Sequence, residues 1–541
     1  MHRTTFSMPW YMGAILAALC LAGPVRAADD LTRPICVSPD GHFLSSPDGS
    51  PFFWLGDTAW SMFMRLTREE SEEYLKDRAA KGFNVIQAVA LGGPLDFLDG
   101  PNRYGHRPLI DGDFARPNPK YFEHVDWVLD RAAQHGLRIA LLPIWGLNQV
   151  TIDKSVDAAT AESYGRWIGR RYRNKGVIWV LGGDTTPMWR MDPPTRPDMP
   201  QRVMQRDTTS VIDDRPVYDA MAAGIVAGAG GDPFITFHPT NLSFSGTAQP
   251  RTSLYFHERA WLDMNMIQSS HFIDPSAHLK SLGADFSWLA PYSYQPIGEE
   301  YRSKPVRPIV DGEPRFEDLA IDLERTASKG YWTGYDARNA AYHALFAGAA
   351  GHTYGNHSVW QFLDPSHKRL YQLPREGTPW RVALGRESTT QMGYAKALFL
   401  SRPYFTRIPD QSVVVSDQGE GSAHVSATRD KDGSYTLVYL PQGQPVTLNM
   451  SKVSGLRAVG WWFDPRTGSS KKIDGAFATT GSTTFVPPSA GPADDWILVV
   501  DDESKAFGAP GTVPAQAPIG QLDCLTRLSS APVDKQIAGN H

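Results

Sequence analysis

The stretch Val177-Ile-Trp-Val-Leu-Gly-Gly-Asp184 is an apolar run that breaks at two glycines and ends on an acid. A second stretch, Pro308-Ile-Val-Asp-Gly-Glu313, has the same form. Short apolar runs bounded by glycine are typical of strands that are buried on both faces, as in a parallel sheet. In an α/β barrel the carboxyl ends of the strands converge on one mouth, so Asp184 and Glu313 would meet there.

Apolar runs of this kind alternate with helical segments along most of the chain. Thr67-Arg-Glu-Glu70 has the pattern of a capping box that opens a helix, and residues 121–135 are apolar at helical spacing. Eight strands alternating with helices predict a (β/α)8 TIM barrel, which we place at residues 28–410. A doubly wound open sheet is the alternative, but no glycine-rich phosphate loop follows the first run. The eight runs cover residues 52–56, 83–91, 138–145, 177–182, 234–239, 264–269, 306–311 and 350–354.

The composition of the chain changes after about residue 410. Short apolar runs, such as residues 435–440, 446–450 and 496–500, are separated by turns rather than by helical segments. Close spacing of this kind predicts a small antiparallel β-sandwich over residues 411–502. Residues 503–541, whose first part is rich in Ala, Pro and Gly, are predicted to form a flexible tail.

Residues 1–27 have the features of a secretory signal peptide. Arg3 gives a basic start, residues 12–23 are apolar, and Val25-Arg-Ala27 has the small-residue ending of a cleavage site. The apolar part is shorter than the ~20 residues that a membrane span needs. We therefore expect a secreted or periplasmic protein without a membrane span.

Two cysteines, Cys36 and Cys524, would remain after removal of the signal peptide. In an oxidising compartment such a pair is a candidate disulfide, and two free thiols are the alternative.

The overall composition limits the kinds of partner. A net charge of −5 argues against nucleic acid. The sequence has neither a CxxC nor an HExxH motif, so it predicts no metal site and no other cofactor. Sixteen Trp and 20 Tyr are many for this length. Because aromatic faces stack on sugar rings, this surplus favours a polysaccharide or oligosaccharide as the substrate.

Polar and aromatic side chains follow most of the predicted strands at the point where the apolar run ends. A pocket lined in this way suits a sugar, because its hydroxyls bond to His, Asn, Gln and Asp while its apolar face packs on an aromatic ring. Any single His could instead be structural, and Asp57 could instead cap a helix. The predicted substrate-binding residues are Asp57, Trp60, Trp145, His238, Gln268, His271, Asp311, His352, Tyr354, Asn356 and Trp360.

Two carboxylates at one mouth are the equipment for cleaving a glycosidic bond. One carboxyl must be protonated to assist the leaving oxygen, and the other must be ionised as nucleophile or base. Asp184 follows two glycines, which let the backbone approach a substrate closely, and we assign it as the acid/base. Glu313 lies between Gly312 and Pro314, which limit backbone freedom, and we assign it as the nucleophile.

Other interpretations of these acids stay open. Asp184 and Glu313 could each cap a helix or bind backbone N–H groups at a strand-to-helix turn. Asp311 would share the face of Glu313 on an extended strand, where it could tune the pKa of Glu313 or bind a hydroxyl.

Longer motifs surround these residues. They are Phe52-Phe-Trp-Leu-Gly-Asp-Thr-Ala-Trp60, Lys81-Gly-Phe-Asn-Val-Ile-Gln87, Trp179-Val-Leu-Gly-Gly-Asp184, Met264-Asn-Met-Ile-Gln-Ser-Ser-His271, Asp311-Gly-Glu-Pro314 and Gly351-His-Thr-Tyr-Gly-Asn-His357. With these motifs the chain resembles the apiosidase-like glycoside hydrolases over roughly residues 38–500. The resemblance implies a (β/α)8 catalytic domain followed by a small β-domain named for collagen binding. It also implies hydrolysis of apiosyl linkages in complex pectin, with the family's acid and nucleophile on Asp184 and Glu313.

A second class of function is a non-catalytic carbohydrate- or matrix-binding protein on a barrel scaffold. The presence of both acids at strand ends favours the enzyme. For the enzyme, retention and inversion of configuration are both open. Acids on the fourth and seventh strands resemble the arrangement of double-displacement glycosidases, which favours retention.

Overall fold

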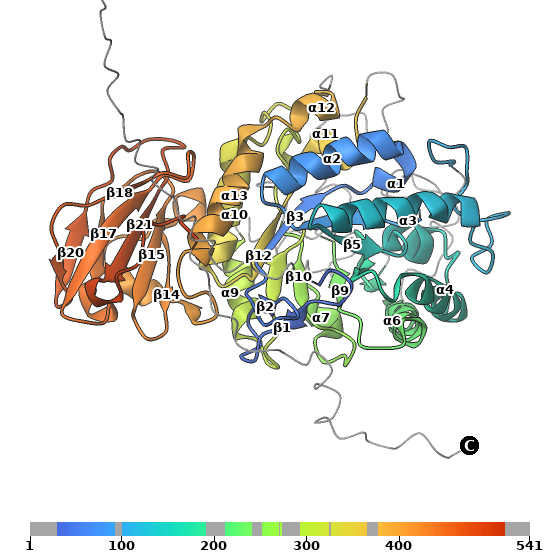
Figure 1. Cartoon of the computed structure of the whole chain (residues 1–541), viewed down its shortest axis with the longest axis horizontal. Coiled ribbons are helices and arrows are strands. Elements are labelled where there is room, and N and C mark those ends of the chain that lie inside the picture. The colour runs from blue at the N-terminus through green and yellow to red at the C-terminus, as the bar shows by residue number, and fades with distance from the viewer. Residues whose placement is uncertain are drawn as a thin grey trace, which may run out of the picture.

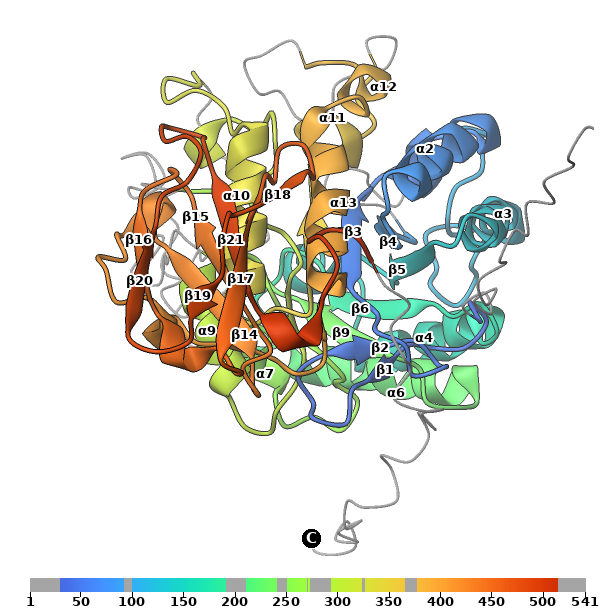
Figure 2. The ribbon, with the colours of Figure 1, turned by 60° about the vertical axis from the view of Figure 1, so that its left-hand side comes forward.

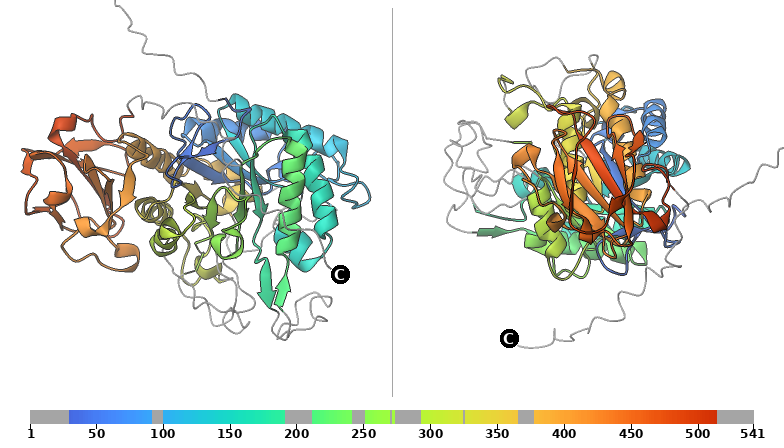
Figure 3. Two further views of the ribbon diagram at one scale, coloured as in Figure 1. Left: turned by 90° about the horizontal axis from the view of Figure 1, so that it is seen from below. Right: turned by 90° about the vertical axis from the view of Figure 1, so that its left-hand side faces the viewer.

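The computed structural model describes residues 30–91, 100–190, 211–240, 251–269, 271–272, 293–323, 326–364 and 377–513. The predicted signal peptide, residues 1–27, lies outside the described residues. The described chain forms two parts, a barrel and a smaller β-domain, which lie side by side (Figure 1). In the right-hand view of Figure 3 the β-domain faces the viewer, in front of the barrel.

The barrel is a nearly closed ring of eight parallel strands. The strands are β3 (Trp54–Thr58), β4 (Val85–Val89), β5 (Arg138–Leu142), β6 (Ile178–Gly182), β9 (Ile235–His238), β10 (Asn265–Ile267), β11 (Ile309–Asp311) and β12 (Gly351–Tyr354). The strands pair in the order β10-β11-β12-β3-β4-β5-β6-β9, in which β12 pairs with β3. At the seam between β9 and β10, Thr236 and Met264 form a parallel bridge, and the Thr236 hydroxyl donates to the Met264 carbonyl at 2.7 Å. The predicted (β/α)8 fold is confirmed.

Helices cover the outside of the barrel (Figure 1). The predicted capping box opens α2, since the Thr67 hydroxyl accepts the Glu70 N–H at 3.2 Å while the Glu70 carboxylate accepts the Thr67 N–H at 2.9 Å. The helices are α1 (Met62–Arg65), α2 (Arg68–Ala80), α3 (Pro119–Gln134), α4 (Ala158–Tyr172), α6 (Arg215–Ala229), α7 (Ser253–Phe256), α9 (Tyr294–Arg302), α10 (Gly334–Phe346), α11 (His357–Trp360), α12 (Trp380–Ala383) and α13 (Glu387–Leu400). Two small antiparallel pairs accompany them, β1 (Cys36–Val37) with β2 (Leu44–Ser45), and β7 (Met188–Arg190) with β8 (Val211–Asp213).

The β-domain is an antiparallel sandwich, as predicted. Its larger sheet has the order β13-β14-β15-β21-β17-β18, with β19 also paired to β17, and its smaller sheet pairs β16 with β20. The strands are β13 (Arg407–Pro409), β14 (Ser426–Asp430), β15 (Tyr435–Leu440), β16 (Val446–Asn449), β17 (Arg457–Phe463), β18 (Ser470–Lys472), β19 (Phe477–Ala478), β20 (Ser482–Phe485) and β21 (Trp496–Asp502). The core between the two sheets includes Val438, Leu448, Phe485 and Leu498.

The other face of the larger sheet packs on the barrel. Tyr439 and Val499 on this face belong to the same apolar cluster as the barrel core. Two buried, two-pronged ion pairs cross the interface: Arg338 of α10 with Asp495 at 2.9 and 2.7 Å, and Arg402 with Asp501 at 2.8 and 2.7 Å. Figure 2 shows β17 and β21 in front of α10 and α13. The β-domain is therefore fixed to these two helices.

The C-terminal segment differs in part from the prediction. Residues 503–505 form a short 3-10 helix, and Phe507 is partly buried with the Arg402 guanidinium 4.9 Å from its ring centre. The predicted flexible tail therefore does not start at residue 503, because an aromatic side chain anchors the chain here. Residues 514–541 lie outside the described residues.

Cys36 is disulfide-bonded. Its expected partner, Cys524, lies outside the described residues, so that pairing stays a prediction. Among the described residues, no helix has both the length and the apolar character that crossing a membrane requires.

A buried ion pair joins the first barrel strand to the first long helix. Asp57 of β3 accepts hydrogen bonds from the Tyr74 hydroxyl at 2.6 Å and from Arg78 Nε at 2.5 Å, and all three residues are fully buried. Burial raises the pKa of Asp57, and the charge of Arg78 opposes that rise. Because its side chain lies between β3 and α2, the prediction that Asp57 binds substrate is wrong, and so is the helix-cap alternative.

We expect Asp57→Ala to lower the free energy of unfolding by about 3–5 kcal/mol, because it leaves the Arg78 guanidinium buried without its carboxylate. Asp77→Ala is the matched control, since Asp77 contacts the same guanidinium from a partly exposed position. Its cost should be at most about 1 kcal/mol. Urea unfolding followed by circular dichroism measures both values, and equal costs would contradict this role of Asp57.

Candidate active site

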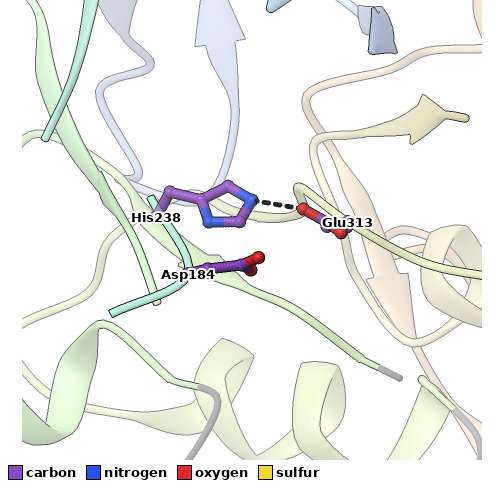
Figure 4. Close-up of side chains that lie close together, drawn as sticks. All are labelled: Asp184, His238 and Glu313. Atoms are coloured by element: carbon purple, nitrogen blue, oxygen red, sulfur yellow. Dashed lines mark ion pairs between the residues drawn. The ribbon is translucent and has the colours of Figure 1, made fainter. Parts of the chain in front are cut away.

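The two acids leave the barrel at the ends of β6 and β11 and meet at one mouth. One carboxylate oxygen of Asp184, one of Glu313 and one ring nitrogen of His238 all lie within 4.8 Å of one another. Figure 4 shows the His238 ring directed at Glu313, with Asp184 beside both. The expectation that the two carboxylates face each other is confirmed. Donors at this spacing could also hold a metal ion, but Gln268 and His271 already supply hydrogen bonds to the two carboxylates.

A tight turn aims Asp184. Three successive residues have positive φ: Gly182 at 89°, Gly183 at 103° and Asp184 at 46°. A Cβ on Gly183 would lie 2.7 Å from the Trp145 ring, so only glycine fits there. Asp184 itself adopts the left-handed conformation, which costs energy for a non-glycine residue and is often found at functional sites.

Two histidines surround Glu313, which is 5% exposed. His271 Nε2 lies 2.9 Å from Glu313 Oε1, and His238 Nε2 lies 3.2 Å from Glu313 Oε2. Burial by itself would raise the pKa of Glu313, but the hydrogen bonds and charges of the two histidines outweigh it and lower the pKa to about 2. Burial likewise opposes the charged form of His238, yet Glu313 and Asp184 raise the pKa of this ring. Glu313 is therefore held as a carboxylate.

The pKa of Asp184 is shifted in the opposite direction to that of Glu313. Burial and then the neighbouring negative charge of Glu313 raise its pKa to about 7. Gln268 Nε2 donates a hydrogen bond to Asp184 Oδ1 at 2.9 Å, which opposes part of that rise. The pair thus consists of one carboxyl that keeps its proton near neutral pH and one that does not.

Two tryptophan rings pack against His238, which lies beside the two carboxyls. Trp60 follows β3 and Trp145 follows β5, and their rings meet edge to face at 5.3 Å. The His238 ring lies 5.4 Å from Trp60 and 6.2 Å from Trp145. Among the predicted residues, Trp60, Trp145, His238, Gln268 and His271 are thus brought together with the two acids.

His352 and Tyr354 are not part of this group. They are the register partners of Leu55 and Asp57 and share their face of the sheet, away from the barrel interior. The Tyr354 hydroxyl donates to the Glu317 carboxylate at 2.5 Å, and burial lowers the pKa of His352 to about 3, which keeps this ring neutral. The prediction that these two residues bind substrate is wrong because both sides of a barrel strand are buried, and these side chains are on the helix side.

Asp311 also differs from the prediction. It is fully buried and accepts the Ser269 N–H at 3.3 Å. The strand β11 ends at Asp311, so the extended geometry that would align it with Glu313 is lost at Gly312. Burial raises the pKa of Asp311 to about 7. Its contacts organise the backbone at the ends of β10 and β11 and do not line the mouth.

Asn356 and Trp360 belong to the loop and helix that follow β12. The Asn356 side chain caps α11, accepting the Ser358 N–H at 2.9 Å and donating to Asp318 at 3.0 Å. This capping explains its burial better than substrate binding does. Trp360 is 7% exposed, and its carbonyl accepts the Ser61 N–H at 3.1 Å, beside the loop that carries Trp60.

Sequence reasoning missed two residues that support Glu313. Gln87 donates to the Gly312 carbonyl at 2.8 Å and so fixes the turn just before the carboxylate. Phe316 packs edge-on against His271 with ring centres 4.8 Å apart. Gln87 interrupts an otherwise apolar buried strand, and this was the signal that could have found it.

Comparisons with known proteins agree with this geometry. Residues 38–406 match the family model of the apiosidase-like catalytic domain, and residues 408–501 match that of a collagen-binding domain described from a collagenase. The chain belongs to the apiosidase-like family. It is a glycoside hydrolase with a TIM-barrel catalytic domain. A search of curated proteins gives no match.

Two solved structures show how far the similarity of this glycoside hydrolase extends. One, a glycoside hydrolase, is 30% identical with a TM-score of 0.74, over 88% of this chain and 99% of that one. The other, a glycoside hydrolase family 5 protein from Bacteroides vulgatus, is 29% identical with a TM-score of 0.76, over 90% of this chain and 97% of that one. The similarity therefore includes both the barrel and the β-domain.

The two carboxyl groups predict the pH dependence of activity. If Asp184 supplies the proton, kcat/KM should fall as the pH rises through about 7, because the carboxyl then loses that proton. Glu313 must be ionised, and its pKa of about 2 leaves it so over the working range. Rates measured from pH 4 to 9 on a substrate with a poor leaving group test this. A rate that rises steadily above pH 7 would contradict it.

Proposed function

We propose that this glycoside hydrolase works by double displacement, with Glu313 as the nucleophile and Asp184 as the acid/base. The observation that carries the proposal is the pair itself: two facing carboxyls whose surroundings move their pKa values in opposite directions. Retaining enzymes have carboxyls ~5–5.5 Å apart, and inverting enzymes ~6.5–9.5 Å. One oxygen of Asp184 and one of Glu313 lie within 4.8 Å of each other, which is closer to the spacing of retaining enzymes.

The proposed reaction has two steps. In the first, Glu313 bonds to the anomeric carbon while the glycosidic bond breaks and Asp184 gives its proton to the leaving oxygen. In the second, Asp184 takes a proton from water, the water oxygen bonds to the anomeric carbon, and Glu313 is released as a carboxylate. His238 and His271 stabilise Glu313 before and after the covalent intermediate.

The substrate we propose is an apiosyl linkage in complex pectin, and the site of action is outside the cytoplasm. The sugar follows from membership of the apiosidase-like family and the location from the sequence of residues 1–27. The Trp60 and Trp145 rings beside the carboxyls fit a ligand with an apolar ring face. The assembled carboxyl pair and the family favour this over a non-catalytic binding protein.

Release of apiose tests the substrate. We expect the purified protein to liberate apiose from pectin fragments that carry apiosyl side chains, and Asp184→Asn and Glu313→Gln to lose at least ~100-fold in rate. Chromatography of the released sugars gives the measurement. Release of a different sugar would contradict the proposed substrate while leaving the reaction class intact.

Stereochemistry tests the mechanism. We expect an activated fluorosugar of the right type to label Glu313 covalently, with the adduct located by peptide mass spectrometry, and Glu313→Gln to remain unlabelled. Product formed early in the reaction should keep its anomeric configuration by NMR. An inverted early product would make Glu313 the base for water instead of the nucleophile.

A further inference from the structure

Gln268 forms a hydrogen bond with Asp184, the proposed acid. Its side-chain amide donates to Asp184 Oδ1 at 2.9 Å, and the residue is 2% exposed. Gln268 directly follows β10, whereas Asp184 follows β6, and β9 lies between these strands in the barrel. The contact therefore reaches across one strand to hold the carboxyl in place.

The backbone at Asp184 is already fixed by other contacts. The Gly183 N–H donates to the His238 carbonyl at 3.1 Å, and the Gly183 carbonyl accepts the Leu147 N–H at 3.0 Å. The positive φ values of the turn further restrict the chain. The carboxyl group itself can still rotate about its bond to the side chain, and the hydrogen bond from the Gln268 amide restricts this rotation.

An amide N–H needs an acceptor, so the oxygen that it contacts is not the one that carries the acid proton. We propose that Gln268 is a positioning residue that leaves the proton of Asp184 on Oδ2 and so aims it at the leaving oxygen. This inference rests on the proposed role of Asp184 as the acid. The hydrogen bond from Gln268 would explain why Asp184 delivers its proton from Oδ2 and not from Oδ1.

The same hydrogen bond has a second effect. Once the proton has left, the amide stabilises the resulting carboxylate and makes Asp184 a stronger acid. The other charged groups that act on this carboxyl are Glu313, which raises its pKa, and His238 and His271, which lower it. Loss of the amide should therefore move the pKa of Asp184 upward.

The strand does not need this side chain for its pairing. The β10 backbone is held by the Gly312 N–H on the Ile267 carbonyl at 2.8 Å and by the Thr252 N–H on the Met266 carbonyl at 3.1 Å. A substitution of similar size at residue 268 therefore tests the amide rather than the fold.

Gln268→Met keeps the length of the side chain and removes the donor. We expect kcat to fall roughly tenfold or more on substrates with poor leaving groups, and to change less than about twofold on activated aryl glycosides, which need no proton. Gln268→Glu should be impaired at neutral pH and regain activity as the pH falls, because a protonated Glu again offers a donor. Gln411→Met is the control, since Gln411 is a hydrogen-bonded glutamine of the β-domain, remote from the mouth. Thermal unfolding of each variant checks the fold.

A titration that needs no substrate separates this inference from the proposed function. Carboxyl carbons of 13C-labelled Asp are followed by NMR, and Asp184 is assigned by difference with Asp184→Asn. We expect Gln268→Met to raise the pKa of Asp184 by roughly 0.5–1 unit, the effect of one hydrogen bond. An unchanged or lower pKa, or an equal loss of rate on both kinds of leaving group, would overturn the inference. A protein that cleaves no glycoside but shows the raised pKa would overturn the proposed function alone.

Discussion

Closure of the barrel is the constraint on which the site depends. Asp184 and Glu313 follow strands that are not neighbours, and only the ring of eight strands places their ends at one mouth. Of the two strands that lie between them, β9 ends in His238, and β10 is followed directly by Gln268 and then by His271. These are the residues that contact the two acids. The order of strands thus determines both where the carboxyls are and what surrounds them.

Electrostatic interactions then give Asp184 and Glu313 different protonation states. Two carboxylates this close repel each other, so one of them keeps a proton. The imidazoles of His238 and His271 contact Glu313 and lower its pKa, so the negative charge of the pair stays on Glu313. Asp184 is left half-buried beside that charge, and its proton is the one available to a substrate. Neither carboxyl has its role because of its residue type.

The sequence predicted the barrel well because each strand was an apolar run that ended at glycine or a polar residue. It located Asp184 and Glu313 for the same reason. It could not tell the two faces of a buried strand apart, since both are covered, and therefore Asp57, His352 and Tyr354 were placed on the wrong side. The strand end at Asp311 and the contact between Gln268 and Asp184 depend on backbone geometry and on residues far apart in the chain. Periodicity carries no information about either.

The position of the β-domain determines whether the chain can be truncated between its two domains. Its larger sheet is covered on both faces, by its own smaller sheet and by the barrel. A cut at the boundary between the two family matches, near residue 407, would expose an apolar surface and would separate Arg338 and Arg402 from their carboxylates. The two family matches therefore cover domains that share one continuous apolar core. Loss of the β-domain should therefore destabilise the barrel as well, because the barrel would keep two buried arginines without their carboxylates.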